Sequence, residues 1–303
     1  MKILITGGSG FIGSHLCRRL SEKNEIVCMD NLRTGKKENI EGLDVEFLEK
    51  DITEPFDIET DLIFNMASPA SPVFYQKYPL ETLETNSIGM KNVLENAKKH
   101  GAKVVQASTS EVYGDPKLHP QNEEYWGNVN PVGPRSCYDE GKRFAESLCI
   151  NYEMKYRVDV VLARIFNTYG PNMLKDDGRV VPNFICQALK NEKMTVYGSG
   201  RQTRSFCHVD DLVEGLVLLS EKGKTGEVYN LGNPTEYTIL QLAEEVKDAC
   251  NSSSEIDYNE LPEDDPIKRK PDITKISSET GWKPKVGLKD GLEKTVEWFK
   301  GVC

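Results

Sequence analysis

The sequence predicts an α/β fold in which a doubly wound parallel sheet, covered by helices on both faces, carries a smaller C-terminal α/β cap. Three features of the 303 residues lead to this prediction. Short apolar runs alternate with segments of helical periodicity through the first half, a glycine-rich turn follows the first run, and the elements become shorter beyond Gly170. Alternating strands and helices are typical of a parallel sheet, whose ligands bind beyond the carboxyl ends of the strands.

The first half of the chain supplies the main sheet. Runs rich in Ile, Val, Leu and Phe predict buried strands, which we place at residues 2–6, 25–29, 45–48, 62–65, 103–107 and 158–163. Apolar residues that recur every three or four positions predict the connecting helices, at residues 11–20, 79–100 and 136–156.

The second half predicts the cap, with some elements returning to the main sheet. By the same patterns, helices are expected at residues 180–189, 209–219, 239–250 and 288–299, and strands at residues 194–196, 227–231 and 255–258. Residues 261–271 are dense in proline and charge, so we expect a surface loop there.

Composition excludes several classes of protein. The chain carries 38 basic and 48 acidic side chains, for a formal charge of −10, and has no basic face suited to nucleic acid. No run approaches the roughly 18 apolar residues of a membrane helix. The eight cysteines are scattered without a CxxC pair or zinc spacing, so we expect reduced thiols, no metal site and a cytoplasmic location.

A glycine-rich turn at Gly7–Gly13 joins the first strand to the first helix. Glycines at these positions let the backbone approach a pyrophosphate, which the helix N-terminus stabilises. Asp30 ends the second strand, where an acid binds a ribose and repels the extra phosphate of NADP. The pattern therefore predicts a Rossmann-type sheet with bound NAD. A plain strand–helix turn, or NADP attracted by Arg33, Lys36 and Lys37, is the alternative.

Tyr138 and Lys142 stand four residues apart, on one face of a predicted helix. A tyrosine pKa of about 10 makes a poor base near neutrality, but an adjacent ammonium and a cationic nicotinamide stabilise the phenolate. A solvated helix face is the alternative. The segment Ser108–Gly114 follows a strand at the same edge of the sheet, where its hydroxyls and carboxylate could face one ligand.

Over nearly its whole length the chain resembles the extended short-chain dehydrogenases/reductases that act on nucleotide sugars, the NAD-dependent epimerase/dehydratase family. The motifs TGGSGFIG, STSEVYG and YDEGK carry this resemblance. Longer matches resemble the UDP-glucuronate decarboxylase (UDP-xylose synthase) branch: ASPASP (67–72), GDPKLHPQNEEYWGNVNP (114–131), RSCYDEGKR (135–143), RIFNTYGP (164–171), DGRVV (177–181), TVYGSGRQTRSF (195–206) and DDPIKRKPDI (264–273).

This resemblance implies a reaction. Bound NAD oxidises UDP-glucuronate at C4, the β-keto acid loses carbon dioxide, and re-reduction gives UDP-xylose. The implied catalytic residues are Tyr138, Lys142, Thr109, Ser110, Glu111 and Arg204. A 4,6-dehydratase of this class has an Asp where Ser110 stands, and simple 4-epimerases have small residues and no placed Glu, so the pair Ser110-Glu111 favours decarboxylation.

The resemblance also implies the binding residues. Those for NAD are Gly7, Gly10, Phe11, Ile12, Gly13, Asp30, Asn31, Thr34, Gly35, Asp51, Ile52, Met66, Ser68, Thr85, Ala107, Tyr138, Lys142, Thr168 and Arg179. Those for the UDP-sugar are Asn167, Arg179, Tyr197, Gln202, Arg204 and Arg269. Residues 1–168 plus 204–234 then form the NAD-binding domain, and residues 169–203 plus 235–303 form the nucleotide-sugar-binding cap.

The chain departs from the family at Glu81 and Glu84, where the family has lysine and where the second position is expected near the sugar. A compensating surface change is one explanation. The alternative is a different substrate or reaction: the decarboxylation of another UDP-hexuronate, or a UDP-hexuronate 4-epimerase. The helices at 79–100 and 136–156 are expected to pair across a two-fold axis in a homodimer, as in the family.

Overall fold

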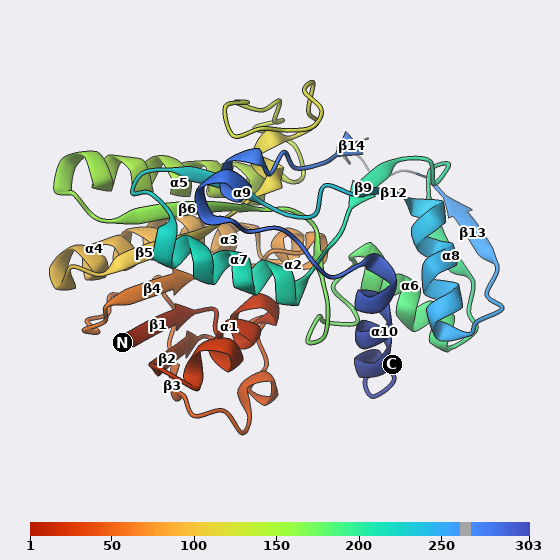
Figure 1. Cartoon of the computed structure of the whole chain (residues 1–303), viewed down its shortest axis with the longest axis horizontal. Coiled ribbons are helices and arrows are strands. Elements are labelled where there is room, and N and C mark those ends of the chain that lie inside the picture. The colour runs from red at the N-terminus through yellow and green to blue at the C-terminus, as the bar shows by residue number, and fades with distance from the viewer. Residues whose placement is uncertain (261–267) are drawn as a thin grey trace.

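A seven-stranded sheet forms the larger lobe of the molecule (Figure 1). The computed structural model describes residues 1–260 and 268–303. In spatial order the strands are β3 (Glu46–Glu49), β2 (Glu25–Asp30), β1 (Lys2–Thr6), β4 (Leu62–Asn65), β5 (Lys103–Thr109), β6 (Val160–Ile165) and β11 (Val228–Leu231). All neighbours pair in parallel. The predicted Rossmann-type sheet is confirmed, and β11 is the element that returns to it from the second half.

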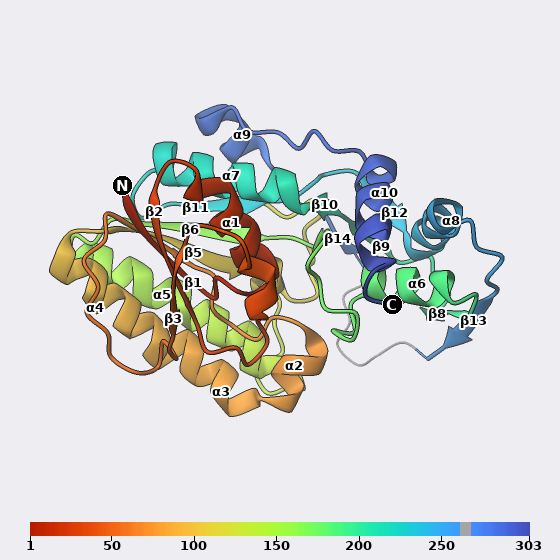
Figure 2. The same cartoon turned by 90° about the horizontal axis from the view of Figure 1, so that it is seen from below.

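Helices cover both faces of this sheet (Figure 2). One face carries α1 (Phe11–Ser21), α7 (Val209–Lys222) and α9 (Thr274–Thr280), and the other carries α3 (Pro79–Glu84), α4 (Met90–His100) and α5 (Ser136–Tyr156). Alternate residues of β1 serve the two cores, because side chains alternate along a strand. Ile3 and Ile5 lie in one core with Leu16 of α1, whereas Leu4 lies in the other with Val93 of α4.

The predicted helix over residues 79–100 is not continuous. A π-helical turn, η2 (Thr85–Gly89), separates α3 from α4. The Thr85 hydroxyl donates to the Glu81 carbonyl, and the Asn86 side-chain amide donates to the Thr82 carbonyl at 2.8 Å. Such bonds compete with the helical ladder. Gly89 leaves room for Ile52, whose Cδ1 lies 2.7 Å from where a Cβ would stand. The chain is thus helical over the predicted residues 79–100, but the π-helical turn within them was not predicted.

The cap forms the smaller lobe around a core of its own. Its helices α6 (Val180–Leu189), α8 (Ile239–Cys250) and α10 (Leu288–Phe299) have the predicted bounds. Its short strands pair as β9 (Thr203–Ser205) with β12 (Glu236–Thr238) and β14 (Lys268–Arg269), and as β8 (Met194–Tyr197) with β13 (Ile256–Asn259). A two-stranded sheet of β7 (Thr168–Tyr169) and β10 (Cys207–His208) lies nearby.

Short elements complete the edge of the large sheet on which the ligand is expected. These are η1 (Lys37–Ile40), α2 (Pro72–Lys77) and η3 (Ser110–Tyr113), which follow β2, β4 and β5 respectively. None was predicted as an element, because each is at most six residues long and is held by tertiary contacts.

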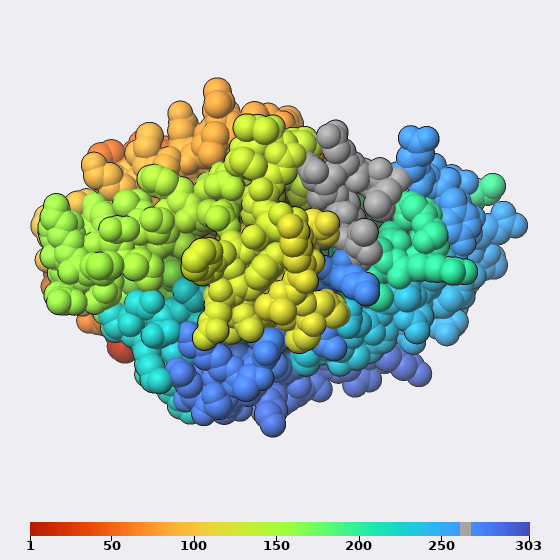
Figure 3. Space-filling view, turned by 90° about the horizontal axis from the view of Figure 1, so that it is seen from above, coloured from red at the N-terminus to blue at the C-terminus, as the bar shows by residue number. Residues whose placement is uncertain are grey.

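The surface loop predicted for residues 261–271 is wrong for its second part; its first part, 261–267, lies outside the described residues. Lys268 and Arg269 form β14, and Arg269 is only 2% exposed. The chain then runs beside the segment around Gln121, whose amide N–H donates to the Lys270 carbonyl at 2.9 Å. Figure 3 shows this segment (yellow) on the surface next to the blue C-terminal segment.

The expectation of eight reduced cysteines is also wrong. Cys186 of α6 and Cys303 form a disulfide, because the packing of α6 against α10 brings their Cα atoms within 5.5 Å. Separation by 117 residues hid this proximity in the sequence. The other six cysteines are free thiols, and five of them are buried. Among the described residues no helix is long and apolar enough to cross a membrane.

A largely buried ion pair, with side chains 12% and 13% exposed, ties α5 to the sheet. The Arg164 guanidinium of β6 donates two hydrogen bonds of 2.8 Å to the carboxylate of Glu146, which also accepts the Ser108 hydroxyl. We expect Glu146→Gln to lower the free energy of unfolding by about 3 kcal/mol, because the neutral amide leaves the largely buried Arg164 guanidinium without its charge partner. Urea denaturation measures this. The control is Glu297→Gln, whose exposed pair with Lys300 contributes about 0.5 kcal/mol or less; equal losses in the two variants would contradict the prediction.

Candidate active site

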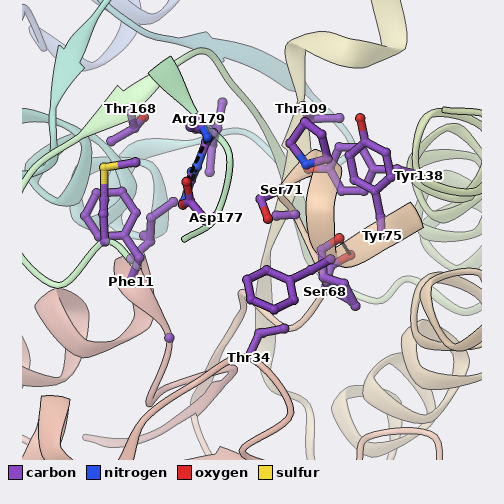
Figure 4. A pocket seen from close by; sticks show the side chains of 18 of the residues that line it. Phe11, Thr34, Ser68, Ser71, Tyr75, Thr109, Tyr138, Thr168, Asp177 and Arg179 are labelled. Carbon is purple, nitrogen blue, oxygen red and sulfur yellow. Dashed lines mark hydrogen bonds and ion pairs between the residues drawn. The ribbon is translucent and has the colours of Figure 1, made fainter. Parts of the chain in front are cut away.

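A cavity of about 570 Å³ lies at the carboxyl edge of the large sheet, between the two lobes. In Figure 4, Thr109, Tyr138 and Tyr75 lie on one side of it, and Phe11, Thr168 and Arg179 lie on the other. All but one of the predicted site residues line this cavity: Gly7, Gly10, Phe11, Ile12, Gly13, Asp30, Asn31, Thr34, Asp51, Ile52, Met66, Ser68, Thr85, Ala107, Thr109, Ser110, Glu111, Tyr138, Lys142, Asn167, Thr168, Arg179, Tyr197, Gln202, Arg204 and Arg269.

The exception is Gly35, which lies behind the Asp30 carboxylate. A Cβ on Gly35 would stand 2.8 Å from the Asp30 Oδ2, so this glycine makes room for the acid without reaching the cavity. Glu81 and Glu84 are also absent from the lining, and Glu84 is exposed. Their replacement of lysine therefore changes α3 outside the cavity lining.

The glycine-rich turn is built for close backbone approach. Gly7 has φ +66°, and its carbonyl lies where a Cβ on Gly13 would stand, only 2.1 Å away. The helix α1 begins after Gly10 with no side-chain cap and no acidic residue in its first turn. Its first N–H groups therefore have no internal partner and suit a phosphate.

Asp30 fits the ribose of a dinucleotide. Its carboxylate accepts hydrogen bonds from the backbone N–H groups of Ser9, at 3.0 Å, and Leu32, at 2.8 Å, which fix its orientation. Burial raises the pKa of Asp30, whereas these two N–H groups lower it. Next to it, the Arg33 guanidinium lies 3.9 Å from the Asp51 carboxylate. Asp51 thus partly neutralises the Arg33 charge, which weakens its attraction for the extra phosphate of NADP. The residues around Asp30 fit NAD.

Tyr138, Thr109 and Lys142 meet at the end of β5. The Thr109 side chain lies close enough to the Tyr138 hydroxyl to lower its pKa, and the Lys142 ammonium donates to the Ala107 carbonyl at 2.9 Å. Burial raises the pKa of Tyr138 and lowers that of Lys142 to about 8. Each shift disfavours a charged form, so ionisation of Tyr138 depends on positive charge brought close to it.

The sequence did not single out Tyr75 as a site residue. Its ring stacks on that of Tyr138, with centroids 5.2 Å apart and planes 9° from parallel. It belongs to α2, and the pair is brought together because α2 packs against α5. A tyrosine in an unpredicted short helix offers no local signal of this contact.

Glu111 is held by two arginines. The Arg135 Nη2 donates to Glu111 Oε2 at 2.6 Å, and the Arg269 guanidinium contacts both carboxylate oxygens, one of them at 2.9 Å. The guanidinium groups outweigh burial and lower the pKa of Glu111 to about 2. Glu111 is therefore ionised at neutral pH. Arg135 was not predicted as a site residue, although it stands three residues before Tyr138 on the same helical segment.

The remaining cap residues are held in place by local bonds. Arg204 of β9 lies in register with Arg269 of β14 and donates to the Thr203 carbonyl at 3.0 Å. The Arg179 guanidinium pairs with Asp177 and lies 5.7 Å from the centre of the Phe11 ring. The Gln202 side-chain amide donates to the Tyr197 carbonyl at 2.7 Å. These basic and polar groups face the glycine-rich turn across the cavity, which suits an anionic ligand.

Comparison with known proteins identifies the family to which this architecture belongs. The NAD dependent epimerase/dehydratase family matches residues 3–232. Over 306 aligned residues the chain is 54% identical to UDP-glucuronic acid decarboxylase 3 of Arabidopsis thaliana, covering 99% of this chain and 89% of that one. It is 52% identical to UDP-glucuronic acid decarboxylase 1 of Xenopus tropicalis, covering 99% of this chain and 72% of that one.

Solved structures of nucleotide-sugar enzymes superpose closely on this chain. The UDP-glucose 4-epimerase of Thermotoga maritima, determined with UDP-glucose, superposes with a TM-score of 0.92 at 31% identity, covering 99% of each chain. The UDP-glucuronic acid 4-epimerase of Bacillus cereus, determined with a fluorinated UDP-glucuronic acid and NAD, superposes with a TM-score of 0.90 at 28% identity, covering all of both.

With its parallel sheet, glycine-rich turn and paired tyrosine and lysine, the chain belongs to the NAD dependent epimerase/dehydratase family. NAD is its cofactor. Within the family, the curated relatives that it matches at 52–54% identity over nearly its full length are UDP-glucuronic acid decarboxylases.

The glycine-rich turn gives a testable requirement. We expect Gly13→Ala to lower the free energy of unfolding by about 1–3 kcal/mol, because the added methyl overlaps the Gly7 carbonyl, and to reduce the NAD that copurifies with the protein. Thermal unfolding and the nucleotide content of the denatured protein measure the two effects. The control is Gly287→Ala, where the nearest atom to the new Cβ lies 3.8 Å away. Wild-type NAD content in Gly13→Ala would contradict this account of the turn.

Proposed function

We propose that this chain is a UDP-glucuronate decarboxylase, a carboxy-lyase that converts UDP-glucuronate to UDP-xylose and carbon dioxide. The observation that carries the proposal is one cavity holding both the Tyr138–Thr109–Lys142 group and a Glu111 carboxylate clamped by Arg135 and Arg269. The first group serves reversible oxidation of an alcohol. The second brings cations to the place where a carboxylate is expected to be lost.

Bound NAD supplies the reversible oxidation of the sugar at C4. Tyr138 holds the proton of the C4 hydroxyl, accepting it during oxidation and returning it during reduction. Thr109 lies beside the phenolic oxygen and favours its ionised form, and the buried Lys142 ammonium stabilises the phenolate. Lys142 needs its positive charge for this, and its pKa of about 8 keeps most of the amine protonated near neutral pH.

Loss of carbon dioxide needs stabilisation of the negative charge that develops on the C4 oxygen and C5. The 4-ketone receives the electron pair of the broken C5–C6 bond as an enolate. Arg269 and Arg204, with Ser110, are placed to orient the departing carboxylate and the enolate. Glu111 fixes the Arg269 guanidinium, and its low pKa argues against a role as the acid that expels a hydroxyl in a dehydratase.

The cap is proposed to hold the UDP group. Asn167, Tyr197 and Gln202 offer hydrogen-bonding groups for uracil and ribose, and Arg179 lies close enough to the turn at Phe11 to contact diphosphate or cofactor. A 4-epimerase or a decarboxylase of another UDP-hexuronate has less support, because Glu81 and Glu84 lie outside the cavity lining.

The product identifies the reaction. We expect the enzyme, given UDP-glucuronate without added reductant, to form a UDP-pentose lighter by carbon dioxide, as measured by mass spectrometry of the nucleotide sugars. Tyr138→Phe removes the group that takes the C4 proton, so we expect it to stop both oxidation and carbon dioxide release while NAD stays bound. The control, Tyr258→Phe on the distant exposed β13, should retain turnover. A product of unchanged mass would instead indicate a 4-epimerase.

We also propose a homodimer formed through α3, η2 and α5. Leu80 and Phe144 are 68% and 51% exposed there, and Leu83 and Ile88 add apolar surface on the same side of the sheet. Exposed apolar side chains that gather on adjacent helices are typical of an interface. We also propose a cytoplasmic location, which the six free thiols favour and the Cys186–Cys303 disulfide opposes.

Gel filtration tests the dimer. We expect a dimer at micromolar concentration and a monomer for Leu80→Glu combined with Phe144→Glu, because burying two carboxylates without partners would cost several kcal/mol. The control Tyr258→Glu places a charge on the exposed β13 of the cap and should remain dimeric. A monomeric wild-type protein would refute the proposed interface.

A further inference from the structure

The buried acid Asp139 has no part in the chemistry described so far. It stands in the first turn of α5, between Tyr138 and Lys142, but does not line the cavity. Its side chain is 6% exposed, and its Oδ1 is buried without a hydrogen-bond donor among the described residues. A buried carboxylate oxygen without a donor is costly, so its presence calls for a physical reason.

Asp139 lies behind the Glu111 clamp. Arg135 precedes it by four residues, so the two side chains share a face of the helical segment, and the Asp139 N–H donates to the Arg135 carbonyl at 3.1 Å. This part of α5 packs against η3, which carries Glu111. The charged groups that act on Asp139 are Glu111 from η3, Arg135, Arg269 from β14, and Glu140 of its own helix.

Two neighbouring tyrosines also act on Asp139. Tyr75 of α2 and Tyr138 of α5 both interact electrostatically with Asp139. Burial and the Glu111 charge raise the pKa of Asp139 to about 7, and the arginines oppose this shift only in part. In the free enzyme the carboxyl group is therefore divided between its two protonation states near neutral pH.

A further negative charge placed at the arginines must disfavour ionised Asp139. We propose that Asp139 takes up a proton when the carboxylate of a UDP-hexuronate binds at Arg269, the arginine shared by Glu111 and the proposed carboxylate site, so that substrate binding and protonation of this buried acid are coupled. The inference rests on the proposed function for the position of the substrate carboxylate. Asp139 acts as a positioning residue, because it compensates charge through the arginines and does not touch the substrate.

The coupling agrees with the atom balance of the reaction. The C5–C6 bond breaks, its electron pair passes into the C4 ketone as an enolate, and C5 then gains one proton. One carboxylate and one proton thus become carbon dioxide and one C–H bond. Uptake of a proton with the substrate brings in the charge that the reaction consumes, and loss of carbon dioxide removes the negative charge that held the proton on Asp139.

Proton uptake can be counted by titration calorimetry in buffers of different ionisation enthalpy. The titrations use the NAD-loaded Tyr138→Phe variant, in which substrate binds without turnover. For UDP-glucuronate we expect an uptake that rises from roughly 0.2 proton at about pH 6.5 to roughly 0.9 at about pH 8, as the free-enzyme pKa dictates. UDP-glucose, which has the same UDP group but no carboxylate, should take up almost none.

The matched variant is Asp139→Asn in the same Tyr138→Phe background. The amide imitates the protonated acid, so uptake should disappear, and affinity for UDP-glucuronate should no longer fall as pH rises through 7. Equal uptake with and without Asp139, or equal uptake with UDP-glucose, would overturn the proposal. A structural role alone would lower stability without changing the proton count.

Infrared difference spectroscopy supplies a second readout that needs no Asp139 variant. Binding of UDP-glucuronate to the Tyr138→Phe protein at about pH 8 should produce the C=O band of a protonated carboxyl group, and absence of that band would overturn the proposal. Product analysis of the wild-type enzyme separates the two hypotheses. Decarboxylation without proton uptake refutes only the role of Asp139, whereas failure to bind or convert UDP-glucuronate refutes the proposed function as well.

Discussion

The contact between Glu111 and Arg269 joins the two lobes at the point where the reaction is proposed to occur. Glu111 follows β5 of the large sheet, and Arg269 lies in β14 of the cap. The Arg269 side chain is buried and Glu111 is 15% exposed, so loss of Glu111 would leave the Arg269 charge without its carboxylate partner. The contact therefore fixes how the cap sits over the sheet and, through the register of β14 with β9, where Arg204 faces the cavity. Together with Arg135, which precedes α5, this pair links η3, α5 and β14 at one end of the cavity.

Burial disfavours charge both in the catalytic pair and in the clamp, but the outcome differs. Tyr138 and Lys142 lie in a poorly solvated part of the cavity that disfavours the charge of each, whereas Glu111 keeps its charge because two guanidinium groups contact it. At the oxidising end, Lys142 is the cation beside Tyr138, and ionisation of Tyr138 responds to the cationic cofactor. The decarboxylating end carries fixed charges and responds to the anionic substrate. One cavity can serve both steps because these ends are separated along η3 and the start of α5.

Local sequence was sufficient for the sheet, most helices and the glycine-rich turn, since apolar periodicity and the Gly7–Gly13 spacing act within one strand–turn–helix unit. It was insufficient wherever distant segments decide the structure. Lys268 and Arg269 have the composition of a surface loop, yet Glu111, more than 150 positions away in the chain, draws Arg269 into the interior. The π-helical turn Thr85–Gly89 lies against Ile52, which only the fold brings close, and the Cys186–Cys303 disulfide depends on the packing of the cap. The cavity-lining residues were named by resemblance to a family, but their mutual contacts required the fold.

The position of β11 at one edge of the sheet has a consequence for biosynthesis. β6 pairs on one side with β5, which precedes it, but its other side is covered by β11, which is synthesised only after α6, β8, β9 and α7. On the ribosome, β6 is therefore an open edge rich in valine while the intervening segments emerge, and open edges recruit other strands. A nascent chain released before residue 228 could complete neither the sheet nor the core beneath α7. Because the chain crosses repeatedly between the two lobes, the large sheet is one of the last parts of the molecule to be completed.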